Sequence, residues 1–188
     1  DMIIKSGIKK ILLNTFHLRD QIFEFIKNKR FEADIQIIDD GNELLNTGGG
    51  ILNMIKNSED QDFIIFNPDT LWKKNYVEEI DKMQNFYFSN KLDNILLMVN
   101  KELSFDKNLV GDFNLINNLV SKDKKNDFIY IGCQILNKSL FNNCRLENFP
   151  ISKIWTELLK KNKLNGFESL SNFYHLTDLE TFKKLKDL

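Results

Sequence analysis

The chain has 188 residues, of which 42% are hydrophobic and 28% are charged, and its net charge at pH 7 is −1. This length predicts one domain with a sizeable core, and this composition excludes a disordered chain. The near-neutral charge gives no reason to expect nucleic acid or an acidic membrane surface as a partner. No apolar run approaches the ~18–20 residues that a membrane span needs.

The chain has two cysteines, Cys133 and Cys144. Their spacing is not typical of a metal site, and two cysteines in a chain of this length make no disulfide framework. The apolar pair Ile3-Ile4 is far too short for the hydrophobic region of a signal peptide. We therefore expect a reduced protein of the cytoplasm.

The first residues read like the end of a helix, because Gly7 is a typical helix stop. The next segment, Ile8–Asn14, predicts a strand whose apolar residues are too closely spaced for the edge of a sheet. A strand buried on both faces needs a neighbour on either side, so we expect a first strand to be missing upstream of Asp1. Without that strand, one edge of Ile8–Asn14 is open and favours association with other chains.

Helical and strand periodicities alternate through the first half of the chain. The ranges are His17–Asn28 (helix), Phe31–Ile38 (strand), Phe63–Phe66 (strand), Asn75–Phe88 (helix) and Asn94–Val99 (strand). This alternation predicts an α/β fold, Rossmann-like, with a mostly parallel sheet and helices on both faces. His17 lies at a strand-to-helix junction, where it either contacts a ligand or is simply a polar residue at a helix start.

The segment from Leu44 to Asp69 is the best candidate for a site. A glycine-rich turn, Gly48–Gly50, opens a short helix, and the strand that follows leads to Asp69. Ligands bind at the carboxyl ends of strands in open α/β sheets, and glycines allow close approach of a backbone. Free N–H groups at a helix start suit a phosphate, and a carboxylate suits a hard divalent cation. Alternatively, the glycines form a flexible loop and Asn67-Pro68-Asp69 is an ordinary turn.

The second half of the chain is less regular. Lys101–Asp127 is polar, with short strand-like pieces, and the pair Gly111-Asp112 stands out within it. Phe128–Leu136 predicts a strand. Its interior Gly132 marks either the close approach of a ligand or backbone, or a β-bulge.

Three further elements are expected near the C-terminus. Phe149–Lys161 predicts a helix, Asn165-Gly166 a hairpin-type turn, and Phe173–His175 a polar strand. Asp178 is a typical N-cap and predicts the start of a last helix.

The order of these motifs resembles the sugar-1-phosphate nucleotidylyltransferases, above all the bacterial enzymes that act on N-acetylmuramate-1-phosphate (uridylyltransferases) or mannose-1-phosphate (guanylyltransferases). Leu44–Gly50 resembles their Leu-Leu-Glu-Thr-Gly-Gly-Gly segment, and Asn67-Pro68-Asp69 resembles their Asn-Gly-Asp. Gly111-Asp112-Phe113 and Phe128–Leu136 resemble two segments near the sugar. Asn14-x-x-His17-Leu18 resembles the start of the family's second helix.

The resemblance implies a nucleotide-diphospho-sugar transferase type of fold and a transfer reaction. In that reaction a sugar 1-phosphate attacks the α-phosphorus of a nucleoside triphosphate and pyrophosphate leaves. It implies Mg²⁺ as cofactor, with Asp69 as catalytic and metal-binding residue, and a role in cell-envelope precursors. The residues that it implies for substrate binding are Thr47, Gly48, Gly49, Gly50, Asn67, Gly111, Asp112 and Gly132.

The chain departs from the family's pattern in three places. The family's signature glycine-rich loop, which binds the triphosphate, is expected upstream of Asp1. His175 stands where the family has a second metal-binding Asp, and a neutral imidazole is a poor Mg²⁺ ligand. Asn46 replaces a Glu, and Pro68 replaces a Gly.

Two hypotheses follow. In the first, the chain is the C-terminal part of a single nucleotidyltransferase domain, and it is inactive without an N-terminal segment or a separate N-terminal chain. In the second, it is a non-catalytic remnant that binds a sugar nucleotide or a partner protein.

Overall fold

The computed structural model describes residues 2–186, which form two compact units. Of the described residues, the first unit comprises 2–61 and 138–157, and the second comprises 62–137 and 158–186. Asp1, which the sequence places at a helix end, lies outside the described residues.

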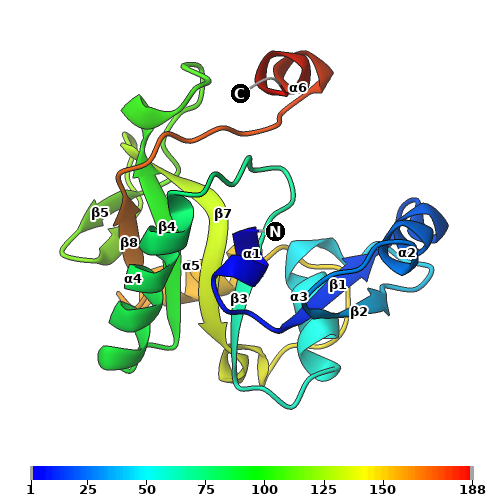
Figure 1. Ribbon diagram of the computed structural model, residues 1–188. Coiled ribbons are helices and arrows are strands. Elements are labelled where there is room, and N and C mark those ends of the chain that lie inside the picture. The colour runs from blue at the N-terminus through cyan, green and yellow to red at the C-terminus, as the bar shows by residue number, and fades with distance from the viewer. Residues whose placement is uncertain (1, 187–188) are drawn as a thin grey trace. The chain divides into compact units, whose positions relative to one another are not determined.

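The first unit contains a short parallel sheet with helices. Its elements are α1 (Met2–Lys5), β1 (Lys10–Thr15), α2 (Arg19–Lys27), β2 (Asp34–Asp39), α3 (Asn46–Lys56) and the 3₁₀ helix η2 (Lys138–Phe141), and it holds the start of α5 (Ser152–Lys160) (Figure 1). Strands β1 and β2 pair in parallel, with Lys10 opposite Asp34 and Thr15 opposite Asp39. The strands expected at Ile8–Asn14 and Phe31–Ile38 and the helix expected at His17–Asn28 are thereby confirmed.

Helix α1 ends as the sequence predicts. Gly7 follows it with φ +81°, a left-handed conformation that glycine adopts without a steric cost. Its N–H donates to the carbonyl of Ile4. The chain then enters β1, whose interior residues are half-buried rather than buried on both faces. Within the first unit, β1 pairs with β2 alone, so one edge of β1 has no partner strand there.

The second unit is built on a four-stranded sheet in the order β3-β7-β4-β8 (Figure 1). Its elements are β3 (Asp62–Phe66), α4 (Tyr76–Ser89), β4 (Asn94–Asn100), the 3₁₀ helix η1 (Lys101–Leu103), β5 (Asn114–Ile116), β6 (Leu119–Ser121), β7 (Phe128–Asn137), β8 (Gly166–Ser169) and α6 (Leu179–Leu185). Strands β5 and β6 form a separate antiparallel hairpin.

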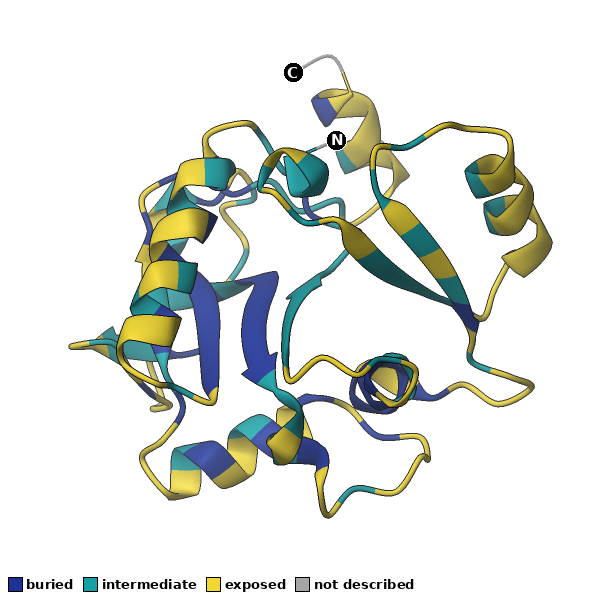
Figure 2. Cartoon of the chain, turned by 60° about the horizontal axis from the view of Figure 1, so that its bottom comes forward, coloured by how far each residue is buried: buried dark blue, intermediate teal, exposed yellow. Residues whose placement is uncertain are grey.

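The core of the second unit lies between the two central strands and helix α4. Nearly every residue of β4 and most of β7 are buried, as the dark blue strands in Figure 2 show. Helix α4 presents one apolar face to this core, with a helical spacing that the sequence anticipates, and its other face is exposed (Figure 2). The residues of α4 that are buried are Tyr76, Ile80, Met83 and Tyr87.

The α/β fold class is confirmed, and the strand directions add to it. Strands β4 and β8 pair in parallel, as do β1 and β2, whereas β7 runs antiparallel to both β3 and β4. A fully apolar run such as that of β7 has the same appearance in either direction, because burial on both faces removes the polar alternation.

Two expectations near the C-terminus are wrong. Asn165-Gly166 does not form a hairpin turn, because Gly166 is the first residue of β8. A Cβ at Gly166 would lie within 3 Å of side-chain atoms of Leu115, Met98 and Val120, so glycine serves close packing there. Residues 173–175 form isolated bridges to Ser104 and Thr70 in place of a strand.

None of the helices in residues 2–186 combines the length and the apolar character that crossing a bilayer requires. The longest, α4, has 14 residues.

Candidate functional site

The glycines of the first unit lie inside helix α3 and not in a turn before it. The helix begins at Asn46, five residues before the expected start at Ile51. Asn46 has φ 59°, which Asn tolerates better than most residues, and its side-chain oxygen accepts a hydrogen bond from the N–H of Thr47. Gly48, Gly49 and Gly50 are all buried.

The segment around Phe149 explains why two of these positions are glycine. The N–H groups of Gly48 and Gly49 both donate to the carbonyl of Phe149, at 2.9 and 3.1 Å. A Cβ at Gly48 would lie 2.4 Å from the ring of Phe149, and one at Gly49 would lie 2.3 Å from the carbonyl oxygen of Glu147. The expectation of free N–H groups is therefore wrong for Gly48 and Gly49.

Gly50 packs against a polar cluster that sequence reasoning did not identify. Its Cβ position lies 2.8 Å from the side-chain nitrogen of Asn14. Asn14 and Asn53 each donate to the carboxylate of Asp40, at 2.7 and 3.0 Å. Asn14 was singled out only through the resemblance, and neither Asp40 nor Asn53 carried a signal of its own.

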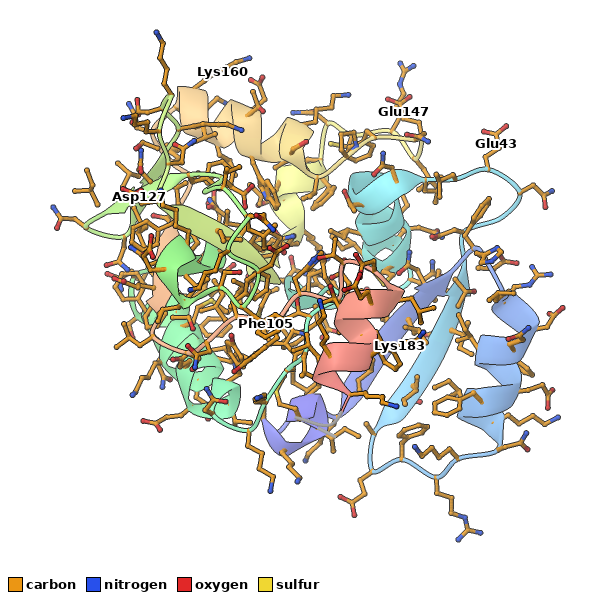
Figure 3. All side chains as sticks on the ribbon, turned by 90° about the horizontal axis from the view of Figure 1, so that it is seen from above. Glu43, Phe105, Asp127, Glu147, Lys160 and Lys183 are labelled. Atoms are coloured by element: carbon orange, nitrogen blue, oxygen red, sulfur yellow. The ribbon has the colours of Figure 1, made fainter. Side chains whose placement is uncertain are left out.

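Thr47 is exposed, but its hydroxyl has a structural partner. It accepts a hydrogen bond from the N–H of Ile151 at 3.0 Å, next to the start of α5. Glu43 and Glu147 point away from α3 into solvent (Figure 3). The glycine segment and its surroundings are thus held mainly by contacts within the first unit.

An open hollow of about 460 Å³ lies at the carboxyl ends of β1 and β2, where ligands bind in open α/β sheets. The first turn of α2, the end of β2 and the loops beside them line it, with the residues Phe16, Leu18, Arg19, Asp20, Gln21, Asp39, Gly41 and Asn42. Arg19 pairs with the carboxylate of Asp39. The N–H of Gly41, and then Arg19, hold the pKa of Asp39 below its usual value. None of the residues expected to bind substrate lines this hollow.

The second unit places Asp69 in a tightly held loop after β3. The N–H of Asn67 donates to the carbonyl of Gly132 at 2.7 Å, and the indole N–H of Trp72 donates to the carbonyl of Asn67 at 3.2 Å. The hydroxyl of Thr70 donates to the carbonyl of Ile131 at 2.9 Å. The loop is therefore fixed against β7.

Gly132 fits both of its expected roles. Its φ is +86°, and the pairing of β4 with β7 shifts register between Leu96 and Met98, opposite this stretch of β7. A Cβ at Gly132 would lie 2.9 Å from the Cβ of Asn67 and 3.1 Å from the hydroxyl of Thr70. The glycine therefore marks an irregular strand and a close approach, and what approaches is the Asp69 loop.

A second segment holds Asp69 from its other side. The N–H of Leu176 donates to the carbonyl of Asp69 at 2.7 Å, and the N–H of Leu71 donates to that of Tyr174 at 2.9 Å. Thr70 and His175 form an isolated antiparallel β-bridge between the two segments. His175, which aligns with the family's second metal-binding position, thereby comes to lie across from Asp69.

The side chains of Asp69 and His175 face each other. The Nε2 atom of His175 lies 3.4 Å from Oδ2 of Asp69, and its Nδ1 atom lies 3.1 Å from the hydroxyl of Thr177. The other carboxylate oxygen of Asp69, Oδ1, is buried and has no hydrogen-bond partner among the described residues. An unpaired buried carboxylate oxygen is costly, so Asp69 stands out as a residue whose charge a bound cation would offset.

Tyr130 adds a group near Asp69 that the sequence did not suggest. Burial, then the neighbouring Cys133 and Asp69, raise the pKa of Tyr130 well above its usual value. Its hydroxyl therefore stays protonated at neutral pH. The position of Tyr130, two residues before Gly132 in β7, was the only signal for it.

Gly111 and Asp112 lie beside the start of β7. The N–H of Asp112 donates to the carbonyl of Phe128, and its carboxylate accepts a hydrogen bond from the N–H of Tyr130 at 3.0 Å. Loss of water around this carboxylate raises the pKa of Asp112, and the bond from Tyr130 opposes that shift. A Cβ at Gly111 would lie 2.3 Å from the carbonyl oxygen of Asn126.

Asp69 fits one ligand of a divalent cation. Mg²⁺ is usually bound by one or two carboxylates, with water and substrate phosphates completing its shell. The Asp69 carboxylate meets that requirement through Oδ2, which faces His175, whereas His175 offers a nitrogen. Residues 2–186 hold no group of three or more His, Cys, Asp or Glu side chains that is arranged for a metal ion.

No protein-family model and no curated protein sequence matches the chain, whereas solved structures do. HddC from Yersinia pseudotuberculosis, also solved with GMP-PN, is 22% identical, with a TM-score of 0.74 over 99% of this chain and 81% of HddC. The inositol-1-phosphate CTP transferase from T. maritima is 10% identical, with a TM-score of 0.76 over 96% of this chain and 75% of that one. UDP-glucose pyrophosphorylase complexed with UDP-glucose is 13% identical, with a TM-score of 0.69 over 99% and 82%. The chain therefore has the α/β fold that these transferase and pyrophosphorylase structures share.

Proposed function

We propose that this chain is part of a nucleotidyltransferase that moves a nucleoside monophosphate from a nucleoside triphosphate to a sugar 1-phosphate. The fold supports this proposal, since similar structures include a CTP transferase of inositol 1-phosphate and a pyrophosphorylase with UDP-glucose. The single observation that carries it furthest is the unpaired, buried Oδ1 of Asp69. This atom lies in the loop after a β-strand of such a fold.

In the proposed reaction, an oxygen of the sugar phosphate attacks the α-phosphorus and pyrophosphate leaves. The protein contributes positioning and charge rather than a covalent intermediate. Asp69 would hold the divalent cation, for which the resemblance implies Mg²⁺, and such an ion would supply positive charge to the phosphates. The backbone contacts of Asn67 and Gly132 keep the Asp69 carboxylate in place.

The other residues that the resemblance implies for substrate binding remain part of the proposal, and the role of Gly48 and Gly49 changes. The N–H groups of Gly48 and Gly49 already donate to the carbonyl of Phe149. We therefore propose that these glycines shape the nucleotide side of the site and do not bind phosphate. Thr47 and Gly50 lie on the same helix. Gly111, Asp112 and Gly132 are proposed for the sugar side.

We also propose that turnover requires a segment outside these 188 residues. The resemblance assigns triphosphate binding to a glycine-rich loop upstream of Asp1, in the same chain or in a separate one. Nucleoside triphosphate and sugar 1-phosphate are then substrates of the combined protein.

A second candidate function is binding without catalysis. The observation that favours it is the imidazole of His175 beside Asp69, where an oxygen ligand would suit Mg²⁺ better. A chain of this kind would bind a sugar nucleotide or a partner protein and release no pyrophosphate.

A binding and turnover titration separates these proposals. UTP, GTP, UDP-sugars and GDP-sugars are each titrated, in the presence of a divalent cation, into two samples. One sample is the chain alone, and the other is the chain co-expressed with the upstream segment. We expect pyrophosphate release only from the combined protein. Binding without release by the combined protein supports the second candidate, and neither binding nor release contradicts both.

The matched variants are Asp69→Ala and Asp81→Ala. Asp81 is an exposed carboxylate on α4 in the same unit. We expect Asp69→Ala to abolish cation-dependent nucleotide binding and Asp81→Ala to leave it unchanged. Unaltered binding by Asp69→Ala contradicts the assignment of the site.

A further inference from the structure

We propose that Asp69 and His175 together bind a divalent cation of the Zn²⁺ class, through the Asp69 carboxylate and Nε2 of His175, in preference to Mg²⁺. The inference concerns the same site as the proposed function. It does not depend on the transfer reaction, because cation binding is measured without nucleotide.

The distance between the two side chains is longer than a strong direct hydrogen bond and leaves room for a shared ion. A charge-assisted N–H···O bond is about 2.7–2.9 Å long, whereas Nε2 and Oδ2 are 3.4 Å apart. Two ligands about 2.1 Å from a tetrahedral ion are about 3.4 Å apart.

The surroundings of His175 resemble those of a metal-binding histidine. Such a histidine usually donates its other ring N–H to an oxygen, which fixes the tautomer and the ring orientation. Here Nδ1 lies 3.1 Å from the hydroxyl of Thr177. When Nδ1 carries the proton, the lone pair of Nε2 is directed toward Asp69.

The backbone holds both ligands before any ion arrives. Asp69 and His175 lie on two segments joined by the bridge between Thr70 and His175. On either side of this bridge, main-chain hydrogen bonds link Leu176 to Asp69 and Leu71 to Tyr174. Little ordering is therefore required when a cation binds.

The chemistry of the donors selects the class of ion. Imidazole suits Zn²⁺ and its neighbours, whereas Mg²⁺ prefers oxygen ligands. An ion at this site also gives the buried Oδ1 of Asp69 a positive neighbour. The side chains of His175 and Asp69 are 31% and 47% exposed, so water or a phosphate has access to the remaining positions.

Co²⁺ is the probe that tests this inference, because its visible absorption reports nitrogen and oxygen ligands in a tetrahedral site and Zn²⁺ displaces it. The matched pair of variants is His175→Ala and His17→Ala, since His17 is the only other histidine of the chain and is exposed in the first unit. A Cys144→Ser version removes the partly exposed thiol as a source of Co²⁺ binding.

We expect a Co²⁺ spectrum from the wild-type chain, His17→Ala and Cys144→Ser, and none from His175→Ala. Excess Mg²⁺ leaves the wild-type spectrum unchanged, whereas Zn²⁺ removes it. Thr177→Ala keeps both ligands and is expected to weaken Co²⁺ binding about tenfold, as the loss of an outer-shell partner does. This variant keeps the inference testable if His175→Ala fails to fold.

Three results would overturn the inference. They are unchanged Co²⁺ binding by His175→Ala, unchanged affinity in Thr177→Ala, and displacement of Co²⁺ by equimolar Mg²⁺. Failure of the proposed function has a different signature: His175-dependent Co²⁺ binding with no binding of any nucleotide by the combined protein. Nucleotide binding without Co²⁺ binding contradicts the inference and leaves the proposed function standing.

Discussion

The glycine segment of α3 and the Asp69 loop both have the sequence pattern of a ligand site, and they differ in what their polar groups do. In the first, Gly48 and Gly49 donate to Phe149, and the space beside them is filled by protein atoms. In the second, the backbone groups around Asp69 are also hydrogen-bonded within the protein, but Oδ1 of Asp69 remains buried without a partner. A glycine shows that something approaches closely, whereas an unpaired polar atom shows that something is missing.

The largest effect that this comparison predicts is on the stability of the first unit. Gly49→Ala places a Cβ 2.3 Å from the carbonyl oxygen of Glu147, a backbone atom that cannot move aside cheaply. We expect the free energy of unfolding to fall by about 3 kcal/mol, against the usual gain from Ala in a helix. Urea unfolding measures it.

Gly50→Ala is the matched control on the same helix. Its Cβ meets the side-chain nitrogen of Asn14, which can move aside by loosening its hydrogen bond to Asp40, so we expect a loss of only about 1 kcal/mol. Equal stability of Gly49→Ala and the wild type would show that the glycines do not serve packing and would revive a role in ligand approach.

Gly132→Ala is expected to have the next largest effect. An alanine there has φ +86° and a Cβ 2.9 Å from that of Asn67. We expect a loss of about 2 kcal/mol in the free energy of unfolding, from backbone strain and crowding together. Because Asn67 and the Asp69 loop must shift, Co²⁺ affinity should fall as well. An unchanged affinity at reduced stability would show that Gly132 does not position Asp69.

Asp69→Asn should have the opposite effect to that of the glycine variants, with stability kept and cation binding lost. The neutral amide removes the negative charge shared by the buried, unpartnered Oδ1, while the rest of this side chain is partly exposed, so we expect the free energy of unfolding to stay within about 0.5 kcal/mol of the wild type or to rise. Cation binding should be lost. Thermal unfolding with and without Zn²⁺ measures both quantities, and a stability loss as large as that of Gly49→Ala would show that the carboxylate is a structural group.

The smallest effect concerns α6, which follows the His175 segment. Asp178 accepts a hydrogen bond from the N–H of Thr181 at 2.7 Å, and this bond holds the pKa of Asp178 below its usual value. A lowered folded-state pKa stabilises the fold above the unfolded pKa, and this contribution disappears as pH falls through the folded value. The protection factor of the Thr181 amide, which compares its exchange rate with the intrinsic rate at the same pH, should therefore fall in acid. Asp178→Asn keeps a cap without the charge, so the same acid response in that variant would contradict this explanation.

Sequence reasoning predicted most helices and strands because their periodicities are long and regular. It failed where contacts with distant segments decide the local conformation. Helix α3 begins at Asn46 because Phe149 and Glu147 pack on glycines that by themselves favour a turn. Gly166 lies in β8 because a hairpin covers it.

The candidate site was predictable only through the resemblance. Alignment placed His175 at the position across from Asp69, and the structure brings the two side chains to 3.4 Å. Periodicity alone gave no reason to pair residues about a hundred positions apart. Asp40 and Asn53 had no local signal, and Tyr130 had only its position near Gly132, because their roles depend on tertiary contacts.

The central claim is that Asp69 holds a cation, and a Co²⁺ titration of the wild-type chain and of Asp69→Asn tests it most directly. Visible absorption monitors the binding, and the two proteins are compared under conditions in which equal fractions of each are folded. If Asp69 holds the cation, the wild type binds Co²⁺, and Asp69→Asn stays folded and binds none. Equal binding by the two proteins would contradict the claim that the unpaired oxygen of Asp69 marks the site.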